Sequence, residues 1–278
     1  MSSTAFLLAF DRGYARMATA LVRSLEHYHA DPDVRVLTLA KDVDELRAWA
    51  RQFQSVRVDP FADAHSFRFG EWHPLIWAKL AAFACADVDS CVVLDVDQIM
   101  YRAGDEFVDR ARASGKSIAA SPDMTRLHGH MRGSWRDDPE LRRLPDAPCF
   151  NAGAMIIRPD VAIYRDVLRV ARAYNQRMFL PEQGVLNLWA YLNEGHCDLT
   201  DRFMLPPMSP KLLRPAIDSC LVHFWTPRPP FFGANPARSG EPTWEEFTAA
   251  FRRDTGAAYP TERFRADFEA RLQGSFTA

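Results

Sequence analysis

Short apolar segments alternate with amphipathic ones over the first sixty residues of the chain. Residues 5–10, 34–39 and 55–58 are rich in apolar and β-branched side chains, which is typical of strands buried in a sheet. Residues 15–29 and 43–53 repeat apolar positions at helical spacing, with polar positions between them. This β-α-β-α-β order predicts a parallel sheet whose crossover connections are right-handed.

The same alternation continues with less regularity toward the C-terminus. Helical patterns cover residues 74–86, 160–178 and 182–193, and short apolar runs at 117–120 and 152–157 indicate two further buried strands. We therefore expect a single large α/β domain that contains all of these elements.

A long polar segment, residues 121–148, separates the last two predicted strands. A connection of this length inside a compact domain is usually a functional loop. It contains His128, His130, Trp135 and several arginines. We expect it to shape a binding groove or a closing lid, and an ordinary surface loop is the alternative.

The tail of the chain has aromatic residues at helical spacing. We expect it to pack by this aromatic face on the preceding domain, with a dimer face or a contact with a membrane surface as alternatives. The chain then divides into one domain, residues 1–240, and a helical extension, residues 241–278. The aromatic positions are Trp244, Phe247, Phe251, Phe264 and Phe268.

Composition excludes several classes of protein. Of the 278 residues 47% are hydrophobic and 25% are charged, which is typical of a globular chain. The net charge of -2 argues against nucleic-acid binding, and no apolar run approaches the ~20 residues of a membrane span. The apolar start of the chain has no basic segment before it, so we expect a buried strand instead of a signal peptide. Five cysteines without a C-x-x-C pair favour a reducing compartment, the cytoplasm.

The strongest chemical signal is an Asp-x-Asp motif that follows an apolar run. Asp95 and Asp97 come directly after Val92–Leu94, and residues two apart in a strand point to the same side. Ligands bind at the carboxyl ends of strands in open α/β sheets. Two carboxylates there make a site for Mg²⁺ or Mn²⁺. Two solvated aspartates in a turn are the alternative.

Further segments follow this motif in a characteristic order. Residues 150–155 read FNAGAM, residues 182–187 read EQGVLN, and residues 221–225 read LVHFW. Together with the Asp-x-Asp motif, they resemble the family 8 glycosyltransferases over residues 4–231. The resemblance implies the GT-A fold, a Rossmann-like α/β architecture with a mixed, mainly parallel sheet flanked by helices.

The resemblance implies roles for residues at the nucleotide and metal. Asp95, Asp97 and His223 match the metal ligands of the family, and an imidazole beside two carboxylates suits Mn²⁺ better than Mg²⁺. Asp11 and Tyr14 match the turn that binds uridine. By itself, His223 is also compatible with a satisfied core histidine, and Tyr14 with an aromatic side chain packed on the core.

The resemblance also implies a pocket for the donor sugar. Asn151, Ala152 and Gly153 match the segment that lines this pocket. Glu182 and Gln183 match an Asp-Gln pair of the family, in which the acid contacts sugar hydroxyls and the glutamine lies near the anomeric carbon. Glutamate in place of aspartate moves the carboxylate by one methylene, which is enough to alter the choice of sugar. A turn residue at 151 and a first-turn acid at 182 are the alternatives.

The sequence departs from the family after the histidine. The family continues with a glycine and a lysine, where this chain has Thr226 and Pro229, although Phe231 keeps the aromatic position. Arg228 would supply the missing cation to the diphosphate, because arginine binds phosphate with two donors. Lys79 matches a lysine that contacts the sugar nucleotide in the family; a solvated helical lysine is its alternative.

The resemblance implies a retaining hexosyltransferase that takes its sugar from a UDP-sugar and depends on Mn²⁺. The acceptor, a carbohydrate, a lipid-linked glycan or a protein, is not readable from the sequence. Two alternatives remain open. A sugar-nucleotide or glycan-binding protein of the same fold would explain the altered lysine position. A phosphatase of the haloacid dehalogenase type would use the first aspartate of its Asp-x-Asp motif as a nucleophile.

Overall fold

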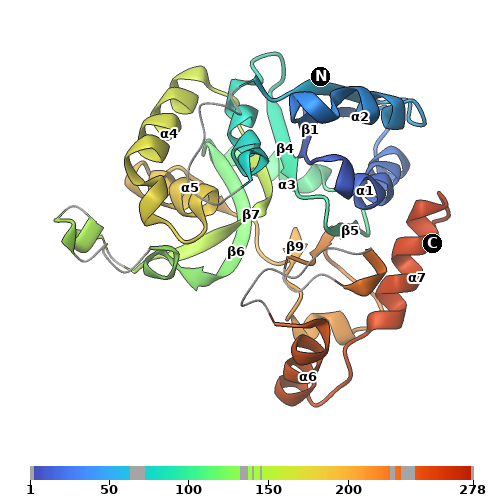
Figure 1. Ribbon diagram of the computed structural model, residues 1–278. Helices are drawn as coiled ribbons and strands as arrows, with labels where there is room; N and C mark the ends of the chain where they lie inside the picture. The colour runs from blue at the N-terminus through green and yellow to red at the C-terminus, as the bar shows by residue number, and fades with distance from the viewer. Residues whose placement is uncertain are drawn as a thin grey trace.

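The computed structural model shows an α/β protein built on one large sheet (Figure 1). Its strands and helices follow the order that the sequence predicts for the first half of the chain. The structure describes residues 3–62, 73–131, 137–139, 141–144, 146–225, 229–232 and 242–276.

The large sheet has seven strands in the order β3-β2-β1-β4-β7-β6-β8. Strands β1 to β4 are parallel to one another, and β7 is antiparallel to both of its neighbours, β4 and β6. The predicted mixed, mainly parallel sheet is therefore confirmed. Its strands are β1 (Thr4–Ala9), β2 (Asp33–Thr38), β3 (Val56–Pro60), β4 (Ser90–Leu94), β6 (Ile118–Arg126), β7 (Pro148–Ile157) and β8 (His196–Asp198).

Helices cover the sheet on both faces. In Figure 1, α4 and α5 lie to the left of the sheet, and α1 and α2 lie to its right. The predicted helix at 74–86 is the 3₁₀ helix η4, and α3 was not predicted. The bounds are α1 (Ala15–Tyr28), α2 (Val43–Ala50), η4 (Pro74–Ala84), α3 (Asp105–Ser114), α4 (Val161–Tyr174) and α5 (Pro181–Leu192).

The alternation of side chains along the strands creates two hydrophobic cores. In β1, Phe6 and Leu8 belong to the core under α1 and α2, whereas Leu7 belongs to the core under η4, α4 and α5. The same alternation holds in β4, where Val92 and Val93 belong to different cores. The central strands β1 and β4 are therefore buried on both faces, which explains why their apolar runs have no polar interruption.

A second, three-stranded sheet lies beside the carboxyl end of β4. It has the order β5-β10-β9, with β5 (Gln98–Met100), β9 (Met204–Leu205) and β10 (Leu221–His223). In the antiparallel pair of β5 and β10, His223 is opposite Gln98. This register brings a residue from late in the chain next to the Asp-x-Asp motif.

The segment 121–148, predicted as a loop, is partly regular. Strand β6 extends to Arg126, and a 3₁₀ helix, η5 (Leu127–His130), follows it. The pairing of β6 with β7 shifts register around Pro122, so the second half of the strand has no clean apolar alternation. Trp135 lies outside the described residues.

The tail forms the two helices that its aromatic spacing predicts, α6 (Trp244–Thr255) and α7 (Thr261–Leu272). In Figure 1, α7 runs beside α1. Phe251, Phe264 and Phe268 are fully buried and belong to the same core as β1 and α1. The division of the chain at residue 240 stays a prediction.

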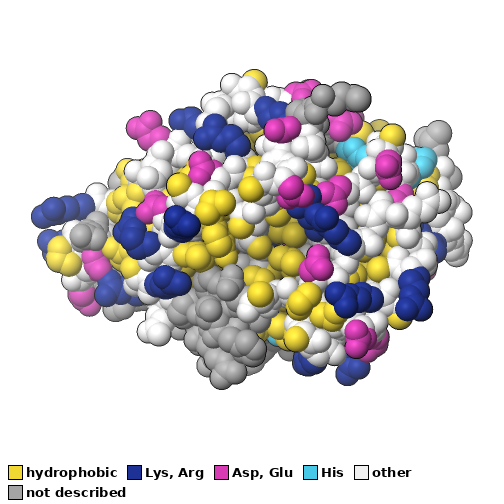
Figure 2. All heavy atoms as spheres, turned by 90° about the horizontal axis from the view of Figure 1, so that it is seen from above, with side chains coloured by type: hydrophobic (Ala, Val, Ile, Leu, Met, Phe, Trp, Pro, Cys, Tyr) yellow, Lys and Arg dark blue, Asp and Glu magenta, His cyan; other side chains and the backbone are white. Residues whose placement is uncertain are grey.

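Both signs of charge are scattered over the face seen in Figure 2, around hydrophobic side chains in its middle. This agrees with the near-zero net charge of the chain. Among the described residues, no helix is both long and apolar enough to span a membrane.

Candidate active site

A cleft of about 460 Å³ opens at the carboxyl ends of β1 and β4. It brings together segments that lie between Ala9 and Trp225 in the sequence, as expected for a site at the carboxyl edge of a parallel sheet. Ten of the twelve residues that the sequence singles out line it: Asp11, Tyr14, Lys79, Asp95, Asp97, Asn151, Gly153, Glu182, Gln183 and His223.

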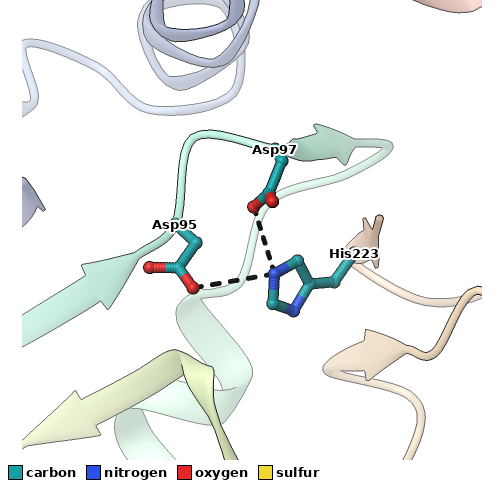
Figure 3. Close-up of side chains that lie close together, drawn as sticks. All are labelled: Asp95, Asp97 and His223. Atoms are coloured by element: carbon teal, nitrogen blue, oxygen red, sulfur yellow. Dashed lines mark hydrogen bonds and ion pairs between the residues drawn. The ribbon is translucent and has the colours of Figure 1, made fainter. Parts of the chain in front are cut away.

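Asp95, Asp97 and His223 form one corner of the cleft, which we call the metal corner (Figure 3). The two aspartates lie in the connection between β4 and β5, and the histidine comes from β10. Nε2 of His223 lies 3.1 Å from Oδ1 of Asp97 and 3.7 Å from Oδ2 of Asp95. One ligand atom from each residue falls within 4.8 Å of the others.

The main chain of β7 fixes this corner. The carbonyl of Gly153 accepts the backbone N–H of Asp95 and the side-chain amide of Gln98, both at 2.7 Å. A Cβ atom at residue 153 would lie 2.0 Å from Cε1 of His223, so only glycine lets the imidazole approach. The glycine of the FNAGAM segment is therefore required by the position of the histidine.

The chemistry of the metal corner fits a divalent cation. Asp97 is only 5% exposed and His223 is 2% exposed, so the alternative of two solvated aspartates in a turn does not describe this site. Two carboxylates and one imidazole are the ligand types of Mn²⁺ and related ions. Nδ1 of His223 is buried without a hydrogen-bond partner, which leaves the ring held by its packing and by its contacts through Nε2.

Lys79 is the nearest cation to these carboxylates in the described part of the chain. Its Nζ lies 2.8 Å from Oδ1 of Asp95 and 3.4 Å from Oε1 of Glu182. Burial opposes the charge of the ammonium group, but the two carboxylates outweigh this effect and raise the pKa of Lys79 above its ordinary value. The lysine is thus a buried ion-pair partner and not the solvated helical lysine of the alternative.

The carboxyl end of β1 leads to a second part of the cleft. Asp11 caps the turn after β1 by accepting the backbone N–H of Gly13 at 2.8 Å. Its other carboxylate oxygen lies 3.8 Å from Nε2 of His73, which the sequence analysis did not single out. Tyr14, at the end of the same turn, also lines the cleft, and so does Trp225, whose ring centroid lies 5.0 Å from that of His223.

The third part of the cleft is a network of side-chain amides. Nδ2 of Asn151 and Nε2 of Gln183 both donate to Oδ2 of Asp123, at 2.9 and 3.1 Å. Their carbonyl oxygens accept backbone N–H groups of Gly153 and Ala152, at 2.8 and 2.9 Å. Ala152 is itself fully buried and contributes to the site only through its main chain.

We call Asp123, Asn151 and Gln183 the amide corner. The second oxygen of Asp123 accepts the backbone N–H and the hydroxyl of Thr125, so the carboxylate receives four hydrogen bonds. Nε2 of His130 lies 2.5 Å from the same hydroxyl and 3.4 Å from Nε2 of Gln183. Burial lowers the pKa of His130, so its neutral form is favoured.

Sequence reasoning missed Asp123 as a site residue and named His130 only as part of a loop. Both lie in the segment 121–148, whose polar composition hides the strand β6 and the helix η5. A useful signal was a carboxylate, Asp123, three residues after the apolar run of β6, because strand ends at this edge supply the other site residues.

Three residues from the segment after β10 have different outcomes. Arg228 lies outside the described residues, and so does Thr226. Phe231 is buried against Phe224 and Phe268 in the core and does not line the cleft. The aromatic position that resembles the family therefore stabilises the packing of the tail.

Solved structures with the same arrangement of elements are glycosyltransferases. The galactosyltransferase LgtC, in a complex with donor and acceptor sugar analogues, superposes with a TM-score of 0.59 at 19% identity, over 95% of this chain and 100% of that one. The bifunctional glycosyltransferase WbbM matches at 0.60 and 14%, over 96% of this chain and 52% of that one. Mouse xyloside xylosyltransferase 1 matches at 0.55 and 14%, over 80% and 97%.

At the level of sequence, no family model matches the chain and no curated protein is significantly similar to it. The structural likeness therefore concerns the fold. With its mixed seven-stranded sheet and its cleft at the carboxyl edge, the chain has the GT-A fold of these glycosyltransferases.

Proposed function

We propose that the chain is a glycosyltransferase that moves a hexose from a UDP-sugar to an acceptor with the help of Mn²⁺ or Mg²⁺. The observation that carries this proposal is the convergence of Asp95, Asp97 and His223 in a cleft of the GT-A fold. A nucleoside diphosphate is a poor ligand for bare carboxylates, so a cation between the two is the natural complement of this corner.

The metal corner would hold the cation, which when bound stabilises the negative charge of the departing diphosphate. Asp95 and Asp97 supply the anionic ligands, and His223 supplies a neutral nitrogen. Lys79 contacts both carboxylate oxygens of Asp95, at 2.8 and 3.0 Å, and reduces the net negative charge that a phosphate would meet. The proposed phosphate contact of Arg228 remains part of this hypothesis.

The nucleoside would occupy the part of the cleft near β1. Tyr14 offers a ring for stacking on uracil, and Asp11 has a carboxylate oxygen directed away from its capping bond that would accept the uracil N–H. His73 beside Asp11 and Trp225 beside His223 also line the cleft and would contact the ribose or the base. Both ends of the donor are then accommodated in one continuous cleft.

The donor sugar would lie between the metal corner and the amide corner. Asn151 and Gln183 have their amides oriented by the main chain of β7 and by Asp123, before any ligand binds. Glu182 borders the same space with a carboxylate held by Lys79 and would accept sugar hydroxyls. Preorganised groups of this kind favour a transition state because they need no rearrangement.

We assign Asp123 a positioning role. Its carboxylate accepts from both amides, which fixes which end of each amide group faces the cleft. The other carboxylates of the cleft have other roles in this proposal. Asp95 and Asp97 belong to the metal corner, Asp11 would bind the nucleoside, and Glu182 forms an ion pair with Lys79. A retaining reaction in which the acceptor attacks from the side of the leaving group needs no separate enzyme nucleophile, and this matches the arrangement.

The experiment that tests the function is UDP release from a panel of UDP-sugars with Mn²⁺, measured for the full chain. We expect turnover of at least one donor that depends on the metal and is lost in Asp97→Asn. The matched control is Asp109→Asn, because the carboxylate of Asp109 is 78% exposed on α3. Binding without turnover of any donor would support a sugar-nucleotide-binding protein instead, and phosphate release from simple esters would support a phosphatase.

We further propose a cytoplasmic location, which rests on the odd number of cysteines. Carbohydrates, lipid-linked glycans and proteins all remain acceptor classes under the general proposal, and a homodimer formed through the tail helices remains open. Fractionation of cells that express the chain tests the location, and size-exclusion chromatography tests the homodimer.

A further inference from the structure

A second cavity of about 510 Å³ lies next to the cleft and shares Asp123 with it. We call it the methionine groove. One wall comes from β6, and the other comes from the chain between β8 and the turn that follows β9. Its lining residues are Pro122, Asp123, Met124, Asp198, Thr200, Asp201, Met204, Pro206, Met208, Ser209 and Pro210.

The two walls are held together by a buried hydroxyl. Ser121 donates to the carbonyl of Thr200 at 2.6 Å and accepts the backbone N–H of Met204 at 3.1 Å. Thr200 itself has a φ of 62°, a left-handed conformation that a β-branched residue rarely adopts. The groove is therefore a built feature whose shape the fold maintains at a cost in backbone energy.

Methionine and proline side chains dominate the groove. Met124 is 67% exposed, although it lies in a strand of the main sheet. Met208 is half-buried on the opposite wall, and the three prolines complete the apolar surface. Methionine is flexible and polarizable, so such a surface adapts to apolar ligands of irregular shape.

Each of the three aspartates that line the groove has at least one partner within the chain. Asp198 accepts the backbone N–H of Thr200 at 2.7 Å, and Asp201 forms an ion pair with Lys211. Asp123 receives its four hydrogen bonds from the amide corner and Thr125. None of the described lining residues carries a positive charge, so the groove offers nothing to an anionic ligand.

We propose that the methionine groove binds an uncharged, apolar aglycone attached to the acceptor sugar. This inference rests on the proposed function. The groove and the cleft meet at Asp123, which lines both, whereas no described residue of the metal corner and neither Asp11 nor Tyr14 lines the groove. An acceptor hydroxyl that reaches the amide corner would thus leave the rest of its molecule in the groove. Of the acceptor classes, a glycolipid-like molecule fits this surface.

The test uses the full chain with ¹³C-methyl methionine and two probes, octyl β-glucoside below its micelle concentration and methyl β-glucoside. We expect the methyl signals of Met124 and Met208 to shift saturably with the octyl probe, while the core signals of Met17 and Met155 stay unchanged. The methyl probe should bind at least about tenfold more weakly, because each pair of buried methylenes contributes about a factor of ten.

A charged variant sharpens this test. Met124→Lys should weaken the octyl probe by about tenfold or more, because it removes the apolar thioether and keeps the chain end of residue 124 hydrated. Leu192→Lys is the matched control, since Leu192 is 53% exposed at the end of α5 and does not line the groove. Equal affinities of the two probes, shifts spread over the core methionines, or an unchanged affinity in Met124→Lys would overturn the proposal.

Titration of UDP with Mn²⁺ by calorimetry separates the two proposals. If UDP binds and the octyl probe shows no preference, the groove assignment fails while the proposed function stands. If UDP does not bind, the proposed function fails, and the assignment of the groove to an acceptor fails with it, even when the octyl probe binds.

Discussion

The metal corner and the amide corner lie in one cleft but are stabilised in opposite ways. In the metal corner, Asp95 and Asp97 face a histidine that is 2% exposed, and Lys79 from η4 pairs with Asp95 and with Glu182, so the carboxylates here outnumber the lysine. In the amide corner, every polar atom of Asp123 has its partners within the chain. The first corner needs a cation to be complete, whereas the second is complete without a ligand.

This difference suggests a division of labour. A corner with uncompensated acid groups is suited to binding a cation and, through it, a diphosphate. A corner with a satisfied network is suited to holding groups in a fixed orientation, because its donors and acceptors have no alternative partners. Substitutions in the two corners should therefore affect different steps.

The largest effect should come from closing the space that the metal corner needs. In Gly153→Ala the new methyl group would lie 2.0 Å from Cε1 of His223 and would displace the ring. We expect Mn²⁺ affinity and UDP release to fall by about a hundredfold or more, because a ligand moves out of reach. Gly129→Ala serves as the control, because a methyl group at residue 129 would lie 4.0 Å from its nearest neighbour, Cβ of Thr125. Unchanged Mn²⁺ affinity in Gly153→Ala would contradict the assignment of His223.

A smaller effect should come from breaking the amide corner. Asp123→Asn replaces an acceptor of two amide donors by a group that itself donates, so the amides of Asn151 and Gln183 lose their fixed orientation. We expect kcat to fall about ten- to a hundredfold while Mn²⁺ affinity stays within about twofold. A parallel loss of metal affinity would show that the two corners are not separate. Asp123→Glu should recover part of kcat, which a purely structural defect would not predict.

Lys79 connects the metal corner to Glu182, and its removal should move two affinities in opposite directions. In Lys79→Met the repulsion between the ammonium group and the cation disappears, so Mn²⁺ alone should bind several-fold more tightly. UDP should bind several-fold more weakly at saturating Mn²⁺, because one positive charge near the phosphates is lost. Calorimetric titrations of each ligand measure both changes, and a decrease in both affinities would indicate that Lys79 is needed only for packing.

The smallest effect concerns protonation of the amide corner. Burial lowers the pKa of His130, so the folded state binds fewer protons than the unfolded state below the unfolded value of about 6.5. The free energy of unfolding should then fall as the pH drops through this value. In His130→Gln the loss of stability between pH 7 and pH 5 should be smaller than in the unmodified chain. Urea denaturation at pH 7 and at pH 5 measures the free energy of unfolding, and His27→Gln, at an exposed histidine, is the control. If the unmodified chain and both variants lost the same stability between these pH values, the lowered pKa of His130 would be refuted.

Much of the fold and of the metal corner could be predicted because the responsible signals are local. Central strands such as β1 and β4 are apolar on both faces, and the Asp-x-Asp motif follows one of them directly. The convergence of His223 on this motif was implied by the resemblance to a family. It depends on the pairing of β5 with β10, a contact between distant segments that periodicity does not reveal.

The amide corner was only half predicted, and the reason is physical. Asn151 and Gln183 belong to segments with recognisable patterns, but Asp123 lies where β6 shifts register against β7. An irregular strand with polar residues has the composition of a loop, so the segment 121–148 was predicted as one. The helix α3 was missed because its sequence is strongly polar outside Phe107, Val108 and Ala111.

The central claim is that the metal corner holds a divalent cation for the diphosphate of a nucleotide. The most direct measurement is a titration of Mn²⁺ followed by electron paramagnetic resonance, with and without UDP. We predict one bound ion per chain, tighter binding when UDP is present, and at least about tenfold weaker binding in Asp97→Asn than in Asp109→Asn. Equal affinities of the two variants, or no effect of UDP on the bound ion, would contradict the account.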